Sequence, residues 1–281
     1  MQHQGKKQPV FSNCPREKHL KEYVIYSAKM EKEVYQDNKH ISLSKQESAL
    51  LNAVEPLTVF SLAAAGSASG WGKKRAANTL AALKRKGALT SVKRDCYTLT
   101  ERIPEKLPLI ATMASAPAYV GFWTAFSIYG FTEQQPAAIQ VVSTRQHPPL
   151  RIGNHPVEVT TVKPERFFGY AMKEGFAIAE AEKLIIDSLC RPDKVGGMAE
   201  LRKCVRNAWQ EIDQHKLSGY LKRFNSKALF ARMGYLIEEL CLESGISGEL
   251  LKRLPTSFVP LNPGRDATKE YNRRWMVMVN D

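Results

Sequence analysis

The chain has 281 residues, 43% of them hydrophobic, so it can bury one large core or two modest ones. Lys and Arg outnumber Asp and Glu by 41 to 28, and the formal net charge of +13 favours an acidic partner such as a nucleic acid. The sequence contains neither an apolar stretch that could span a bilayer nor a secretory signal, so we expect a cytoplasmic protein without membrane contact. The five scattered cysteines and the histidines lack metal-ligand spacing, which predicts reduced thiols, no metal site and no cofactor.

The positive charge is concentrated in residues 1–100, which carry 17 basic and 8 acidic side chains. Residues 1–43 read as a charged N-terminal extension, in which 16–37 is predicted to be a helix with a broken apolar stripe. Two interpretations of this helix are open: it packs on the next domain, or it is a dimerisation arm.

The spacing of apolar residues in 44–100 predicts three helices followed by a hairpin of two strands, which is the order of elements in a winged helix-turn-helix. Ser44 is placed to cap the first helix, Thr58 the second, and Gly87 to end the third. The Gly/Ser-rich segment 66–72 predicts an unusually long turn between the second and third helices, in which Trp71 either packs inward or lies against DNA. The predicted elements are helices at 45–54, 59–65 and 73–86 and strands at 88–92 and 96–99.

The third helix of this region carries the candidate DNA contacts. If Ala76, Leu80 and Leu83 face the core, a 3.6-residue repeat places cations and an asparagine on the opposite face. Lys and Arg reach phosphates and guanine edges, and Asn can bond adenine, while basic residues at the hairpin turn would reach neighbouring phosphates. The candidate DNA-binding residues are Lys73, Lys74, Arg75, Asn78, Arg85, Lys93 and Arg94.

In the remainder of the chain, we expect a proline-bearing linker at 101–117 and a domain of helices and strands at 118–281. The fold class is therefore α+β, an N-terminal winged helix-turn-helix followed by a mixed helical domain with a small β-sheet. The expected strands are 138–143, 157–162, 177–179 and 275–279, and the expected helices are 118–129, 181–190, 199–210, 216–224, 227–243 and 247–254.

Residues 118–134, which read AYVGFWTAFSIYGFTEQ, resemble the AbiEi antitoxin family, in which an aromatic helix ends in a similar Gly-Leu-Thr-Glu-Gln turn. Five further pieces follow in the order and spacing of that family. They are RFFG at 166–169, AEKLIID at 181–187, PDKVGG at 192–197, SKALFARMGYLIE at 226–238 and RWMVMVN at 274–280. Together with the winged helix, the resemblance covers residues 44–281 and leaves the extension outside the pattern.

The resemblance implies an antitoxin of a type IV toxin–antitoxin system of phage defence. Such an antitoxin counters a nucleotidyltransferase-like toxin without requiring a stable complex with it. It also represses its own operon by binding inverted repeats in promoter DNA, which implies two DNA-reading units and a homodimer on DNA.

Most residues of the motifs that carry the resemblance are of types that usually have structural roles. Phe122, Trp123 and Phe126, for example, recur at helical spacing and are expected in the core. Asp187, Arg232 and Glu238 are candidates for a buried ion-pair set or a partner-facing surface. No catalytic motif is recognisable, so no enzyme is expected. Two other functions are open: a stand-alone regulator with a ligand- or partner-binding C-terminal domain, and an RNA-binding protein. A winged helix used only for protein contact is also compatible with the sequence.

Overall fold

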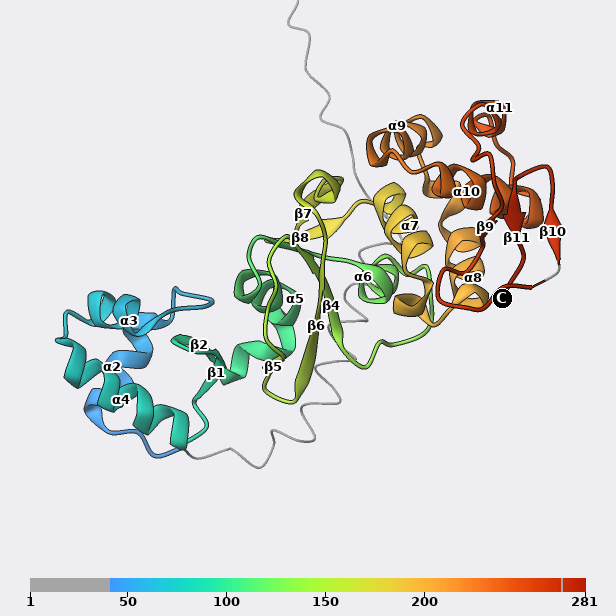
Figure 1. The fold of residues 1–281 in the computed structure, drawn as a ribbon. Helices are drawn as coiled ribbons and strands as arrows, with labels where there is room; N and C mark the ends of the chain where they lie inside the picture. Colours follow the sequence, from blue (N-terminus) through green and yellow to red (C-terminus); the bar gives the residue numbers. More distant parts are fainter. Residues whose placement is uncertain (1–40, 269) are drawn as a thin grey trace, which may run out of the picture.

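The computed structural model describes residues 41–268 and 270–281, a mixed α+β structure (Figure 1). The expected charged extension, including its helix at 16–37, lies outside the described residues except for residues 41–43. None of the described helices is long and apolar enough to cross a membrane.

The first part of the described chain contains three helices and an antiparallel hairpin (Figure 1). Ser44 caps the first helix as expected, because its side chain accepts a hydrogen bond from the Glu47 backbone while the Glu47 carboxylate accepts one from the Ser44 backbone. Leu50, Leu80 and Leu83 lie in a small core shared by the helices and the hairpin. The elements are α2 (Lys45–Val54), α3 (Leu62–Ser69), α4 (Lys73–Arg85), β1 (Leu89–Lys93) and β2 (Cys96–Leu99).

The second helix is displaced from its predicted position. Phe60 is extended because it forms a two-way backbone bridge with Tyr97 of β2, with N–O distances of 3.0 and 2.8 Å. The helix can begin only after this bridge, so Ser61 rather than Thr58 caps it. It then continues to Gly70, whose φ of 68° ends the helix in the left-handed region that favours glycine. The predicted long turn is therefore wrong, and three residues, Gly70 to Gly72, separate α3 from α4.

The predicted linker at 101–117 is also wrong, because most of it forms the helix α5 (Ile103–Ala114), preceded by a 3-10 turn, η2 (Thr100–Arg102). Pro104 lies in the first turn of α5, where a missing N–H group costs no helical hydrogen bond. Pro108 is accommodated by a kink at Lys106. Ile103 and Ile110 are fully buried, so this segment is part of the core rather than a connection over the surface.

A six-stranded mixed sheet forms the centre of the second part and is larger than the small sheet expected (Figure 1). The segment that starts at Ala118 is a strand, and the aromatic helix begins only after Gly121. The sheet order is β5-β6-β4-β3-β8-β7. The bounds are β3 (Ala118–Val120), β4 (Ile139–Ser143), β5 (Leu150–Ile152), β6 (His155–Thr161), β7 (Tyr170–Lys173) and β8 (Phe176–Ala179).

Helices cover this sheet, and several of them lie beyond the end of the sheet that is farther from the β1–β2 hairpin (Figure 1). α5 packs on β3, β4, β5 and β8, while α6 packs on β4. The helices expected at 181–190, 199–210, 216–224, 227–243 and 247–254 are all present, the first with its predicted bounds and the other four with shifted ends. Together with the aromatic helix, α6 (Phe122–Tyr129), they are α7 (Ala181–Cys190), α8 (Met198–Ala208), α9 (Gln214–Phe224), α10 (Lys227–Glu239) and α11 (Ser247–Leu251), with short 3-10 turns η3 (Pro164–Arg166), η4 (Pro192–Val195) and η5 (Trp209–Glu211).

The end of the described chain forms a small three-stranded sheet of β9 (Val259–Pro260), β11 (Val277–Met278) and β10 (Tyr271–Asn272), with β11 in the centre. Trp275 precedes β11 and is almost fully buried. Its ring lies directly over Gly234 of α10, where a Cβ atom would stand only 2.0 Å from the ring. Glycine at position 234 is therefore required for the terminal segment to pack on α10.

Candidate functional site

The exposed side of α4 carries the sequence-predicted DNA contacts. Ala76, Leu80 and Leu83 are buried, as the periodicity predicted. The predicted contact residues of this helix are all exposed: Lys73, Lys74, Arg75, Asn78 and Arg85. α4 contains no acidic residue, so its solvent-facing surface has one sign of charge.

A stripe of side chains runs along this exposed surface at the spacing of helical turns. Lys74 and Asn78 are one turn apart, Ala81 follows, and Arg85 lies near the end of the helix. The small exposed side chain at Ala81 leaves room for close approach between the two longer groups. The major groove of B-DNA admits an α-helix, whose exposed polar side chains then reach the base edges.

The first turn of α4 combines several features that disfavour an isolated helix. Gly72 occupies the N-cap position and supplies no side-chain hydrogen bond. Lys73, Lys74 and Arg75 place positive charge at the positive end of the helix dipole, which costs free energy in the absence of an anion. An approaching phosphate would relieve this repulsion and accept hydrogen bonds from the free backbone N–H groups.

The other cations of the region are not equally available. Lys86, which follows α4, donates to Glu47 at 2.7 Å and to the Ser42 carbonyl oxygen at 2.8 Å. These bonds tie the end of α4 to the beginning of α2. Lys86 therefore has a carboxylate partner that holds it in place.

The other two predicted contact residues, Lys93 and Arg94, lie at the hairpin turn. Arg94 is exposed at the turn, but the Nζ of Lys93 donates to the Ala114 carbonyl oxygen at 2.6 Å. Asp95 accepts a hydrogen bond from the Leu62 backbone at 2.8 Å, so the turn is held against the start of α3. Both side chains are thus exposed, and the Nζ of Lys93 is directed toward the second part of the chain.

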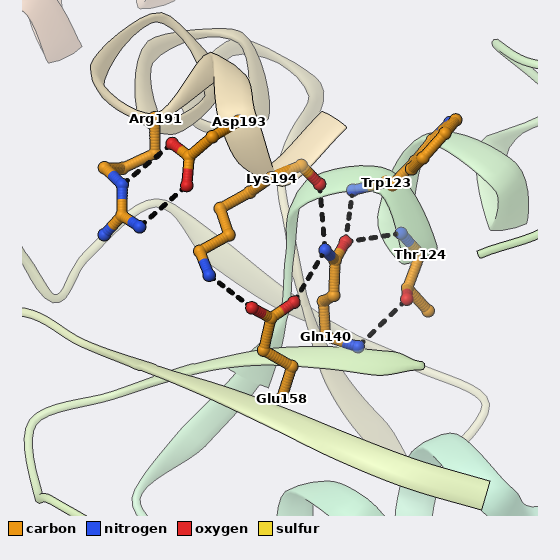
Figure 2. Close-up of polar contacts among 7 residues, drawn as sticks. All are labelled: Trp123, Thr124, Gln140, Glu158, Arg191, Asp193 and Lys194. Carbon is orange, nitrogen blue, oxygen red and sulfur yellow. Dashed lines mark hydrogen bonds and ion pairs between the residues drawn. The ribbon is translucent and has the colours of Figure 1, made fainter. Parts of the chain in front are cut away.

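A second polar cluster, which sequence reasoning missed, joins α6 to the sheet and to η4 (Figure 2). The buried Gln140 side chain accepts hydrogen bonds from the backbone of Trp123 at 2.8 Å and of Thr124 at 3.4 Å. Its amide nitrogen donates to Glu158 at 3.0 Å and to the Lys194 carbonyl oxygen at 2.8 Å. The side-chain oxygen therefore holds the start of α6, and the side-chain nitrogen joins it to β6 and η4.

The charged side chains of this cluster, which Figure 2 also draws, are more exposed than Gln140. Lys194 forms an ion pair with Glu158, and Arg191 forms a two-point pair with Asp193 at 2.9 and 2.8 Å. Although burial opposes it, hydrogen bonds from Lys194 and Gln140 lower the pKa of Glu158. A polar residue at an inward-facing strand position, such as Gln140, is the one sequence signal that could have indicated this cluster.

The residues suspected of forming one ion-pair set, Asp187, Arg232 and Glu238, are in three different places. Arg232 donates to the carbonyl oxygens of Pro260 and Leu189, at 2.8 and 3.3 Å. Glu238 accepts from Arg274 at 2.8 Å and from the Trp275 indole at 2.9 Å. The three residues therefore do not form one ion-pair set.

Asp187 belongs instead to a buried group on α7. It pairs with Lys183, one helical turn earlier, and accepts a hydrogen bond of 2.8 Å from Tyr119. Burial lowers the pKa of Lys183 and raises the pKa of Asp187, because both charged forms lose their hydration. Lys183 has no exposed surface, so the group holds α7 against β3 rather than presenting a site to solvent.

No group of three or more His, Cys, Asp or Glu side chains in the described part of the chain is arranged to hold a metal ion. The chemistry that these residues support is the binding of an anionic partner by α4, with the polar groups of the second part positioning helices.

This chain is similar to a solved structure over most of its length and to a protein family over residues 119–239. The chain is similar to the crystal structure of the RV2827C protein from Mycobacterium tuberculosis, with a TM-score of 0.64 and 13% identity, over 85% of this chain and 92% of that one. This likeness shows a shared fold. No curated protein has a significant match. Residues 119–239 match the AbiEi antitoxin C-terminal domain. This match agrees with the family that the sequence motifs indicated.

Proposed function

We propose that this protein is an antitoxin that counters a nucleotidyltransferase-like toxin and represses its own operon by binding promoter DNA. The family of residues 119–239 supports the antitoxin role. The arrangement of residues 44–100 supports the DNA-binding role, as a winged helix-turn-helix.

Three features support the winged-helix assignment. α3 and α4 are separated by a three-residue turn, the usual length in a helix-turn-helix. The β1–β2 hairpin follows α4 directly, and the bridge between Phe60 and Tyr97 adds a short third strand on the other side of β2. In this arrangement α4 is the recognition helix, which enters the major groove with its N-terminal residues forward.

The single observation that carries the proposal is the charge of the exposed face of α4. A solvated helix face usually mixes acidic and basic residues, whereas α4 has exposed cations at both ends and no acid. Lys74 and Asn78 are suited to base edges near the start of the helix, and Arg85 is suited to a phosphate near its end. Binding to inverted repeats would place two protomers on each operator.

The test is binding of the full-length protein to three probes of equal length: its own promoter duplex, an unrelated duplex and a structured RNA. The proposal predicts preference for the promoter duplex and an affinity that falls steeply as salt rises. Growth rescue on co-expression with the toxin candidate from the adjacent gene tests the antitoxin role in parallel. Promoter binding without rescue would favour a stand-alone regulator, and preference for the RNA would contradict the repressor role.

A further inference from the structure

Trp71 and Arg75 form a contact where the turn between α3 and α4 meets the recognition helix. The guanidinium carbon of Arg75 lies 4.0 Å from the centroid of the Trp71 ring, well within the range of a cation–π interaction. Trp71 is partly buried and packs against the core that α2, α3 and α4 share, whereas Arg75 is exposed. The indole therefore connects an exposed cation to the rigid core of the module.

Arg75 differs from the other cations that contact structural partners. Lys86 is bonded to Glu47, and Lys93 is bonded to Ala114. Arg75 has no ion pair with any described carboxylate, so the contact with Trp71 leaves the guanidinium N–H groups available to a ligand. A hydrogen-bonded partner would have occupied those donors, whereas an aromatic face does not.

We infer that Trp71 is a positioning residue that orients Arg75 for a two-point contact with a guanine edge in the operator. The inference rests on the proposed DNA-binding function. A planar guanidinium matches the O6 and N7 acceptors of guanine, but a free arginine side chain loses conformational freedom when it binds. Stacking on an indole that is itself held by the core removes part of that loss before DNA arrives.

The experiment compares Trp71→Leu, Trp71→Phe, Arg75→Ala and the double variant Trp71→Leu/Arg75→Ala with wild type. Each protein is checked for folding by circular dichroism, and its affinity is measured for the promoter duplex and for an unrelated duplex of equal length. We expect Trp71→Leu to weaken promoter binding roughly threefold to tenfold, the range of one cation–π contact with its pre-organisation. Affinity for the unrelated duplex should change little, and Trp71→Phe should keep most of the preference.

The double variant separates positioning from a merely structural role. If Trp71 acts through Arg75, the double variant binds the promoter no more weakly than Arg75→Ala alone. An equal further loss in the Arg75→Ala background would overturn the inference, as would wild-type promoter preference in Trp71→Leu. If Arg75→Ala weakened binding to the promoter duplex and to the unrelated duplex equally, Arg75 would contact a phosphate, and the guanine contact would be overturned. Lys84→Ala, which removes another exposed cation of α4, is the control for charge alone. Failure of the wild-type protein to bind duplex DNA would instead contradict the proposed function.

Discussion

The Nζ of Lys93, the last residue of β1, donates a hydrogen bond of 2.6 Å to the carbonyl oxygen of Ala114, the last residue of α5. A cation at this position also interacts favourably with the negative end of the helix dipole. Val92 and Cys96 of the same hairpin are buried in the large core that contains α5 and the six-stranded sheet. The hairpin thus belongs to two parts of the structure: it completes the small core of residues 44–100 and joins this core to the larger one.

This joint predicts different effects for two adjacent cations. Lys93→Ala should lower the free energy of unfolding by roughly 1 kcal/mol, the usual contribution of one hydrogen bond, and leave the salt dependence of DNA binding unchanged. Arg94→Ala should leave stability unchanged and reduce the log–log salt slope by about one unit, as expected for one lost phosphate contact. Urea unfolding and salt titrations measure the two effects, and a reversal of the two phenotypes would contradict the joint.

The buried helix α5 predicts where the chain can be divided. A fragment of residues 100–281 keeps Ile103, Leu107 and Ile110 in the core and should fold. Because this fragment lacks Val92, the part of the core that packs on Val92 becomes exposed, which should lower the melting temperature. A fragment of residues 118–281 loses α5, and each missing large side chain costs about 2–5 kcal/mol. It should therefore show no cooperative thermal transition by circular dichroism. Equal melting temperatures for the two fragments would show that α5 is dispensable.

The pair between Lys194 and Glu158 predicts a pH dependence of stability. The folded state lowers the pKa of Glu158, so the stability from this group is present above its unfolded value, near 4.5, and is lost as pH falls through the lower folded value. Lys194→Met should lower stability at pH 7 and reduce the loss on acidification. Lys203→Met, at an exposed position, is the matched control. Urea unfolding at pH 7 and pH 4 measures the difference, and parallel pH profiles for Lys194→Met and wild type would count against the pair.

Asn78 predicts a change in base preference. Because it lies on the exposed stripe of α4, Asn78→Ala should lose a two-point contact with adenine and relax the preference for one operator base pair by roughly 1–3 kcal/mol. Arg85→Ala should weaken binding to all duplexes alike. A panel of single-base operator variants provides the measurement. An unchanged preference profile in Asn78→Ala would remove this residue from the base-reading set.

The sequence was informative wherever local periodicity decided the structure. The spacing of Ala76, Leu80 and Leu83 was sufficient to orient α4, and the family motifs were sufficient to assign residues 119–239. It was misleading where distant contacts decided. Phe60 is extended because Tyr97 is its partner, and no pattern within residues 58–65 contains that information.

Prolines and short strands produced the other errors. Pro104 and Pro108 suggested a linker, but one lies in a first helical turn and the other follows a kink, so both fit inside α5. β7 was missed because its side chains are mostly exposed and show no buried alternation. The site was only partly predictable for a related reason: Lys93 is cationic like its neighbours, and only the fold shows that its Nζ reaches Ala114.

The central claim is that one exposed helix reads DNA while the AbiEi domain supplies toxin neutralisation. The most direct measurement is a Lys74→Ala/Asn78→Ala variant tested for promoter binding by gel shift and for growth rescue on toxin induction. Both side chains are exposed, so the variant should fold as wild type does. The account predicts loss of promoter preference with full growth rescue. Wild-type promoter binding in this variant, or loss of rescue at normal protein levels, would contradict it.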